Sequence, residues 1–237
     1  IGFDEDVVNA FSEQYAIGGA SLVVSPLQMA AAQGMLMNGG VYIEPHCITR
    51  IEYIDGSQEP YVPTYTGVQV ISPAAAYCIA SMMEKNVSND IYLGNVKAIR
   101  HNYQVYAKTG TSDWGTAGRQ YGIPTTAIKD HWMNASTSQF TIATWTGYDK
   151  AVAGQTSYMS WNTYNRNTVA KIDNLMLDSL EASYGTPASI TAPADLGSAT
   201  HVKGTWPYLA PPSWFPSEYI VSGYTKVKLT FYSDEIF

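Results

Sequence analysis

The sequence predicts an α+β domain in which three antiparallel strands form a meander with helices beside it. Three segments alternate apolar residues with polar or small ones at a period of two, which is typical of strands; they are residues 103–111, 130–134 and 139–148. Three other segments carry capping residues or apolar residues at i, i+3 and i+4 spacing, which is typical of helices; they are residues 25–38, 72–85 and 165–184. Consecutive strands of this kind predict a meander in sequence order.

The first of these helices has the clearest boundaries. Ser25 precedes Pro26, and Gln28 follows at the third helical position, so the segment has a capping box with proline at the first helical position. The Asn-Gly-Gly segment at 38–40 predicts its end. The Ser-Pro pair at 72–73 starts the second helix in the same way.

The segments between these elements carry weaker signals. Residues 4–16 predict a further short helix, because acidic residues precede three apolar ones. Residues 41–55 are expected to be extended, and residues 56–70 to form a loop or a short strand. Residues 114–129 predict a long glycine-containing loop beside the end of the first strand, and loops of that length are usually either lids or disordered.

Composition limits the class of protein. The chain has 237 residues, 46% hydrophobic and 14% charged, with a formal net charge of −7, which argues against disorder. No basic run is present, so nucleic-acid binding is not expected. Cys47 and Cys78 make no disulfide framework; a single bridge stays open, and two buried thiols are preferred. The histidines are scattered, which predicts no metal site, and no apolar segment reaches 18 residues.

The composition changes after residue 187. The following residues are rich in proline and large aromatic residues, so we expect residues 1–187 to form one unit and 188–237 a C-terminal extension. Residues 226–232 could form a final strand. The aromatic residues of the extension could bind sugar or cell wall, or could pack on the domain, and the sequence favours neither.

The candidate site is Lys108-Thr109-Gly110-Thr111, at the end of the first predicted strand. Alternation places Thr109 and Thr111 on one face, with Lys108 beside them. Two hydroxyl groups and an ammonium group are suited to binding a carboxylate, and Gly110 leaves room for a peptide along the strand edge. The N–H of Thr111 could donate to a carbonyl oxygen. The alternative is an ordinary turn, because a three-residue motif is a weak signal alone.

Three blocks of sequence together resemble class A penicillin-binding proteins. They are residues 17–31 with 38–45, residues 108–113, and residues 129–133 with 145–149. The loop with Tyr-Gly-Ile-Pro at 121–124 is similar to that of the bifunctional enzymes of Gram-positive cocci. The resemblance covers about residues 1–190 and implies the C-terminal part of a D,D-transpeptidase domain, in which helices cover both faces of an antiparallel sheet. The implied activity cross-links peptidoglycan stem peptides through a serine acyl-enzyme, the target of β-lactam antibiotics.

The resemblance also identifies motifs that this chain lacks. The family requires Ser-x-x-Lys, whose serine is the nucleophile, and then Ser-x-Asn, both before Lys-Thr-Gly. No serine here has lysine three residues later, and Ser160-Trp161-Asn162 follows Lys108, so we interpret it as chance. We therefore expect the chain to be the C-terminal part of a larger enzyme, starting just after the second motif, with the nucleophile outside this chain.

The resemblance implies roles for the site and its partners. Lys108 would act in catalysis through its charge and in proton transfer, and residues 108–111 would bind the substrate. The expected partners are the N-terminal portion of the same enzyme, a stem peptide and β-lactams, without a metal or cofactor. The enzyme would work extracytoplasmically at the cell surface, with membrane attachment only through its N-terminal portion. The alternatives are an inactive wall-peptide-binding module and a related serine β-lactamase or D,D-carboxypeptidase.

Overall fold

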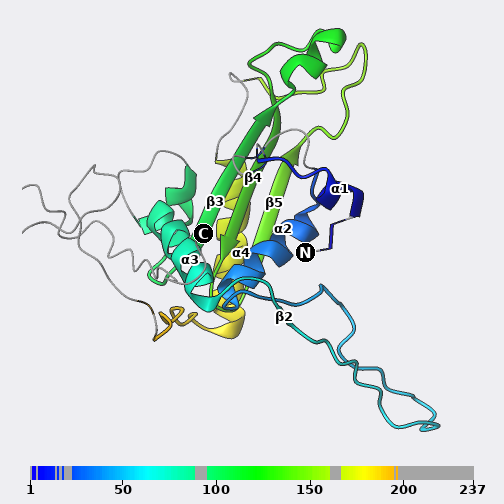
Figure 1. The fold of residues 1–237 in the computed structure, drawn as a ribbon, viewed down its shortest axis with the longest axis vertical. Coiled ribbons are helices and arrows are strands. Elements are labelled where there is room, and N and C mark those ends of the chain that lie inside the picture. The colour runs from blue at the N-terminus through cyan, green and yellow to red at the C-terminus, as the bar shows by residue number, and fades with distance from the viewer. Residues whose placement is uncertain are drawn as a thin grey trace, which may run out of the picture.

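The computed structural model describes most of the first 196 residues (Figure 1). The described residues are 2–3, 5–13, 15, 18, 23–88, 95–160, 167–194 and 196. Most of the expected extension, including the strand predicted at 226–232, lies outside them, as do residues 161–162 of the Ser-x-Asn match. The extension and its boundary therefore remain expectations.

Three strands form the central sheet, and they follow one another in the order of the sequence. These strands are β3 (Tyr106–Asp113), β4 (Ile128–Ser136) and β5 (Thr141–Gly147), paired antiparallel in the order β3-β4-β5. The predicted meander is confirmed, although β3 begins three residues later than expected and continues to residue 113. The pairing of β3 with β4 is regular up to Ser112 and shifts between Ser112 and Asp113.

Helices cover both faces of this sheet, as Figure 1 shows. On one face α2 (Pro26–Met37) packs against β5 and β4, and α3 (Pro73–Ser88) packs against β3 and α2. On the other face α4 (Thr168–Tyr184) packs against β4 and β5. The core consists of apolar side chains from α4 and from the face of the sheet that packs against α4. They include Ala107, Met133, Ala135, Ile142, Val169, Ala170 and Leu177. The predicted α+β fold with helices on both faces is confirmed.

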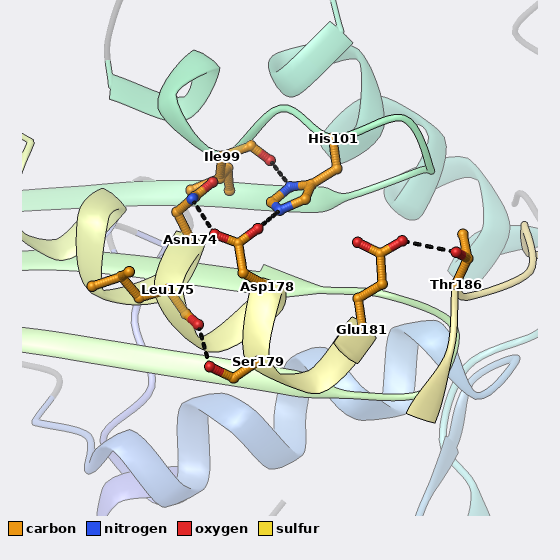
Figure 2. Close-up of polar contacts among 8 residues, drawn as sticks. All are labelled: Ile99, His101, Asn174, Leu175, Asp178, Ser179, Glu181 and Thr186. Atoms are coloured by element: carbon orange, nitrogen blue, oxygen red, sulfur yellow. Dashed lines mark hydrogen bonds and ion pairs between the residues drawn. The ribbon is translucent and has the colours of Figure 1, made fainter. Parts of the chain in front are cut away.

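Polar contacts fix α4 to the chain that leads into β3 (Figure 2). His101, which follows the 3₁₀ helix η2 (Asn95–Ile99), places its Nε2 3.0 Å from Oδ1 of Asp178 on α4. The other ring nitrogen, Nδ1, is 2.9 Å from the carbonyl oxygen of Ile99. Asn174 donates to Oδ2 of Asp178 at 3.0 Å. Both carboxylate oxygens of Asp178 therefore have partners, and His101 fixes α4 to the segment that leads into β3.

The predicted start and end of α2 are confirmed. The backbone N–H of Gln28 donates to Ser25 Oγ at 3.2 Å, and the N–H of Ser25 donates to Gln28 Oε1 at 2.9 Å, which completes the capping box. At the other end the N–H of Gly40 donates to the carbonyl of Met35 at 2.9 Å. Gly40 has φ +85°, and a Cβ there would lie 2.1 Å from the carbonyl oxygen of Ile71, so only glycine is accommodated.

One prediction near the N-terminus needs correction. The first helix, α1 (Glu5–Asn9), is shorter than predicted, because none of its side chains is buried and a single turn has little to stabilise it. Residues 41–55 contain the two-residue strand β1 (Val41–Tyr42). The loop or short strand predicted at 56–70 is confirmed by β2 (Val68–Gln69), which pairs antiparallel with β1. The chain between them projects from the body as an arm (Figure 1).

The predicted long loop and the predicted buried thiols also need correction. Residues 114–129 contain the 3₁₀ helix η3 (Gly115–Tyr121), which packs the buried Gly118 against Trp114 and ends at Gly122 with φ +70°. Cys47 is exposed on the projecting arm and Cys78 is half-buried on α3, and the two cysteines are not joined by a disulfide. None of the described helices has the length and hydrophobicity that a membrane-spanning segment needs.

Candidate active site

The candidate tetrapeptide lies on a strand with a free edge. β3 pairs with β4 along one side, and no described strand pairs with its other side. α3 covers the beginning of this free edge, where Asn86 donates to the carbonyl oxygen of Ala107 at 3.2 Å. Residues 109–113 lie beyond that contact. The structure therefore presents the tetrapeptide as a strand margin that an extended peptide could join.

Lys108 is exposed, and its ammonium group lies at the strand itself. Its Nζ donates to the carbonyl oxygen of Thr109 at 2.6 Å. In the sheet Lys108 is opposite Asn134 of β4, and the Asn134 side chain is buried. The side chains of both residues are on the face of the sheet that is covered by α2 and α3. The positive charge is thus held beside the backbone of the tetrapeptide, at an open margin of the sheet. Two hollows elsewhere, one beside Arg100 and one between α2 and β1, are not lined by residues 108–111.

Thr109 and Thr111 share the opposite face, as alternation predicts. Thr109 is in register with Met133, which is fully buried against α4, and Thr111 is in register with His131. Thr109 is half-buried, whereas Thr111 is exposed. Burial lowers the pKa of His131, so its imidazole is neutral at physiological pH and adds no cation next to Thr111. Lys108 therefore supplies the positive charge of the tetrapeptide.

Gly110 lies where a side chain would press on a neighbouring strand. It is opposite Trp132 of β4, and a Cβ at residue 110 would lie 3.3 Å from the Cβ of that tryptophan. Its backbone is extended, so the requirement for glycine is one of space rather than of conformation. A flat strand at this point leaves the margin open to an approaching chain.

A polar network that sequence reasoning did not predict follows the tetrapeptide. Asp130 of β4 accepts hydrogen bonds from Ser112 Oγ and, at 3.0 Å, from Trp145 Nε1 of β5. Lys129 Nζ lies 3.5 Å from Asp130 Oδ2 and 5.2 Å from the centre of the Trp114 ring. Asp130 and Trp145 belong to the segments on which the family resemblance rests, but only the strand register shows that their side chains meet.

A buried carboxyl group lies behind the sheet, on α4. Asp173 is fully buried and accepts a hydrogen bond from Thr144 Oγ1 of β5, while its Oδ2 has no hydrogen-bond partner. Burial raises the pKa of Asp173 to about 7, although the hydrogen bond from Thr144 acts in the opposite direction. Thr144 pairs with Met133 on the neighbouring strand, and Met133 pairs with Thr109. Asp173 therefore lies on the face of the sheet to which the side chain of Thr109 points.

No group of three or more histidine, cysteine, aspartate or glutamate side chains with metal-binding geometry occurs among the described residues. The chemistry that the described part of the site offers is therefore that of an ammonium group, two hydroxyl groups and backbone N–H groups at a strand edge. Such a set can bind an anionic group and orient a peptide carbonyl. It does not contain an activated nucleophile.

Comparisons with known proteins identify the family of the chain. Residues 3–172 match the family model of the penicillin binding protein transpeptidase domain. Penicillin-binding protein 1A/1B of Bacillus subtilis is 32% identical over 161 residues, covering 66% of this chain and 17% of that protein. Penicillin-binding protein 1A of Streptococcus pneumoniae is 28% identical over 142 residues, covering 59% of this chain and 19% of that protein. The chain therefore spans less than a fifth of these relatives.

Solved structures show the same fold. PonA1 of Mycobacterium tuberculosis, solved in complex with penicillin V, superimposes with a TM-score of 0.50 at 26% identity, covering 78% of this chain and 43% of that structure. Penicillin binding protein 3 of Mycobacterium tuberculosis gives a TM-score of 0.55 at 18% identity, covering 73% of this chain and 38% of that structure. The resemblance to class A penicillin-binding proteins is confirmed: this chain belongs to the penicillin-binding protein transpeptidase domain family.

Proposed function

We propose that this chain supplies the substrate-binding strand of a serine D,D-transpeptidase that cross-links peptidoglycan stem peptides. The observation that carries the proposal is the free edge of β3, which presents Lys108, Thr109 and Thr111 without an intervening side chain at Gly110. A stem peptide or a β-lactam would lie along this edge, as an added strand does. Its carboxylate would be bound by the two threonine hydroxyl groups and the ammonium group of Lys108.

Backbone groups at this edge would orient the reacting carbonyl. The carbonyl oxygens of Ala107 and Thr109 both accept hydrogen bonds from side chains, Asn86 and Lys108, which supports an edge-facing orientation for the odd-numbered residues of β3. Because backbone groups of a strand alternate between its two edges, the N–H of Thr111 would face the same way. That N–H would donate to the carbonyl oxygen that becomes negatively charged when a nucleophile attacks.

The nucleophile would come from a different part of the same enzyme. This chain contains no Ser-x-x-Lys, and it spans less than a fifth of the Bacillus subtilis and Streptococcus pneumoniae relatives, so the serine, its lysine base and the Ser-x-Asn would lie in a preceding portion. Lys108 would then shape the electrostatic field around those groups and assist proton transfer between them. The same portion would carry the membrane attachment of an enzyme that acts extracytoplasmically on the cell wall.

Labelling by a fluorescent penicillin tests this division of roles. The complete enzyme should become covalently labelled, and this chain alone should not, because acylation needs the serine. In the complete enzyme Lys108→Ala should slow labelling by about a hundredfold, the size expected for loss of one charged group that stabilises the transition state. Lys171→Ala, which removes an exposed lysine from α4 on the other side of the sheet, is the matched control and should label normally.

Three results would count against the proposal. Covalent labelling of this chain alone would show that it contains its own nucleophile. An unchanged rate for Lys108→Ala would remove Lys108 from the site. Reversible binding of penicillin by the complete enzyme, without any covalent label, would favour the inactive wall-peptide-binding module instead.

A further inference from the structure

We propose that Asp130 is a positioning residue that fixes the Thr111 end of β3 through Ser112. The proposal deepens the function given above and rests on it. Asp130 itself would not touch the substrate. It would hold the backbone of the strand whose free edge binds the substrate, so that the N–H and hydroxyl group of Thr111 keep one orientation.

The geometry of the Asp130 carboxylate supports this role. Its Oδ2 accepts a hydrogen bond from Ser112 Oγ on β3, and its Oδ1 accepts one from Trp145 Nε1 on β5 at 3.0 Å. Because Asp130 belongs to β4, a single carboxylate links the three strands of the sheet. Ser112 is also the backbone neighbour of Asp130 across the β3–β4 pair, so the side-chain bond reinforces that pairing.

The environment of the carboxylate makes these bonds strong. The Asp130 side chain is only 17% exposed, so water competes little for its oxygens. Lys129 Nζ lies 3.5 Å from Oδ2, and this ammonium group also lies over the Trp114 ring, so it is held close to the carboxylate. Hydrogen bonds to an ionised acceptor are about twice as strong as neutral ones. Asp130 is thus a firm anchor rather than a solvated surface charge.

The anchor lies at the point where β3 would otherwise be least constrained. The regular β3–β4 register ends at the Ser112–Asp130 pair, because Asp113 pairs with Ile128 and Lys129 is an extra residue in β4. Such an irregularity disrupts the ladder and increases the local twist, so the Ser112–Asp130 side-chain bond would constrain β3 where its regular pairing ends. Thr111 is the residue next to Ser112, on the tetrapeptide side. A displacement of about 1 Å in a group that binds the reacting carbonyl is enough to slow a reaction strongly.

Substitutions on both sides of the Ser112–Asp130 bond test the proposal in the complete enzyme. Ser112→Ala removes the bond and leaves Asp130 with Trp145, while Asp130→Ala removes both bonds. Each should lower the rate constant of acylation by a fluorescent penicillin at saturation by about tenfold. The half-saturating concentration should change little, because carboxylate binding by Thr109 and Lys108 is retained. This split distinguishes positioning of Thr111 from loss of affinity.

Asp130→Asn provides the conservative rescue. Its amide oxygen can still accept from Trp145, and its amide nitrogen can donate to Ser112 Oγ, because a hydroxyl group both donates and accepts. The rate constant should therefore return to within about threefold of the starting enzyme, since a neutral hydrogen bond replaces a charge-assisted one. An Asn variant as slow as the Ala variant would contradict a positioning role and favour a direct role of the charge.

Ser136→Ala is the matched control for a general loss of stability. Ser136 lies at the opposite end of β4, is fully buried, and accepts a hydrogen bond from Gln33 of α2 at 2.8 Å. The control should lower the melting temperature at least as much as Ser112→Ala does, yet leave acylation unchanged. If both serine variants slow acylation equally, or if Ser112→Ala acylates normally, the inference is wrong. If the unsubstituted enzyme is not acylated at all, the proposed function itself fails.

Discussion

Replacing Asp173 by asparagine should remove the contribution of this buried carboxyl group to the pH dependence of stability. Asp173 is fully buried on α4, and burial raises its pKa to about 7 from an ordinary value of 3.8. Between about pH 4 and pH 7 the native state therefore keeps a proton on Asp173 that the unfolded chain has already released. Because the raised pKa belongs to an acid, the contribution of Asp173 to stability is greatest below about pH 4. It is lost as the pH rises to about 7.

The size of the effect follows from the shift in pKa. Each unit corresponds to about 1.4 kcal/mol, so a shift from 3.8 to about 7 amounts to about 4 kcal/mol of unfolding free energy. The introduced asparagine would carry no charge at any pH, and its amide oxygen would still accept from Thr144 Oγ1. Its amide nitrogen would replace Oδ2, which has no partner, so a constant cost of about 1–3 kcal/mol is expected at every pH.

Urea unfolding of the full chain checks the reasoning. It is measured at about pH 4.5, 6 and 7.5, which are roughly the two ends and the middle of the range between the unfolded and native pKa values of Asp173. The difference in unfolding free energy between Asp173→Asn and the unsubstituted chain should shift in favour of asparagine as the pH rises, at a slope of up to about 1.4 kcal/mol per unit. Asp149→Asn, which changes an exposed carboxyl group after β5, is the control and should show no such slope. A difference for Asp173→Asn that does not depend on pH would refute the buried, protonated carboxyl group.

Three further substitutions test the fold and the strand edge. Ser25→Ala should cost about 1 kcal/mol in urea unfolding, because it removes the hydroxyl group of the α2 capping box. In the same assay Leu177→Ala should cost about 2–5 kcal/mol, whereas the exposed Leu175→Ala should change stability by about 0.5 kcal/mol or less; equal effects would contradict the core on α4. Gly110→Ala should slow acylation of the complete enzyme, since its Cβ would press on Trp132, and a normal rate would show that the strand margin tolerates the methyl group.

The parts of the fold that the sequence predicts are those fixed by local chemistry. The capping box at Ser25 and the Asn-Gly-Gly end of α2 depend on hydrogen bonds within a few residues, so both are readable from the sequence. The alternation in β4 and β5 is visible because one face of each strand packs against α4. The sequence overestimates the length of α1, because it does not show that none of the side chains of this helix would be buried.

The sequence predicts the residues of the candidate site, but it does not predict the side-chain contacts that hold them in place. The Lys-Thr-Gly-Thr segment stands out because its residue types suit a carboxylate, and the structure places it on an open strand margin. Asp130 and Trp145 are 15 positions apart in the sequence, and their contact depends on the β4–β5 register. A register shifted by one residue would turn one of these side chains to the opposite face. Contacts of this kind become visible only when the sheet is known.

The two ends of the tetrapeptide strand are held by different elements, and this arrangement bears on the proposal that its free edge binds a substrate. At its start Asn86 of α3 donates to the carbonyl oxygen of Ala107, and at its end Asp130 accepts from Ser112. The segment between them keeps its free edge, yet both ends are fixed. A substrate that pairs with a rigid edge avoids the cost of ordering it, about 1–2 kcal/mol per residue. Asn86→Ala should therefore weaken penicillin binding in the complete enzyme by raising the half-saturating concentration, whereas Ser112→Ala should lower the acylation rate constant. Identical effects of the two substitutions would show that the strand responds as one unit rather than through two separate anchors.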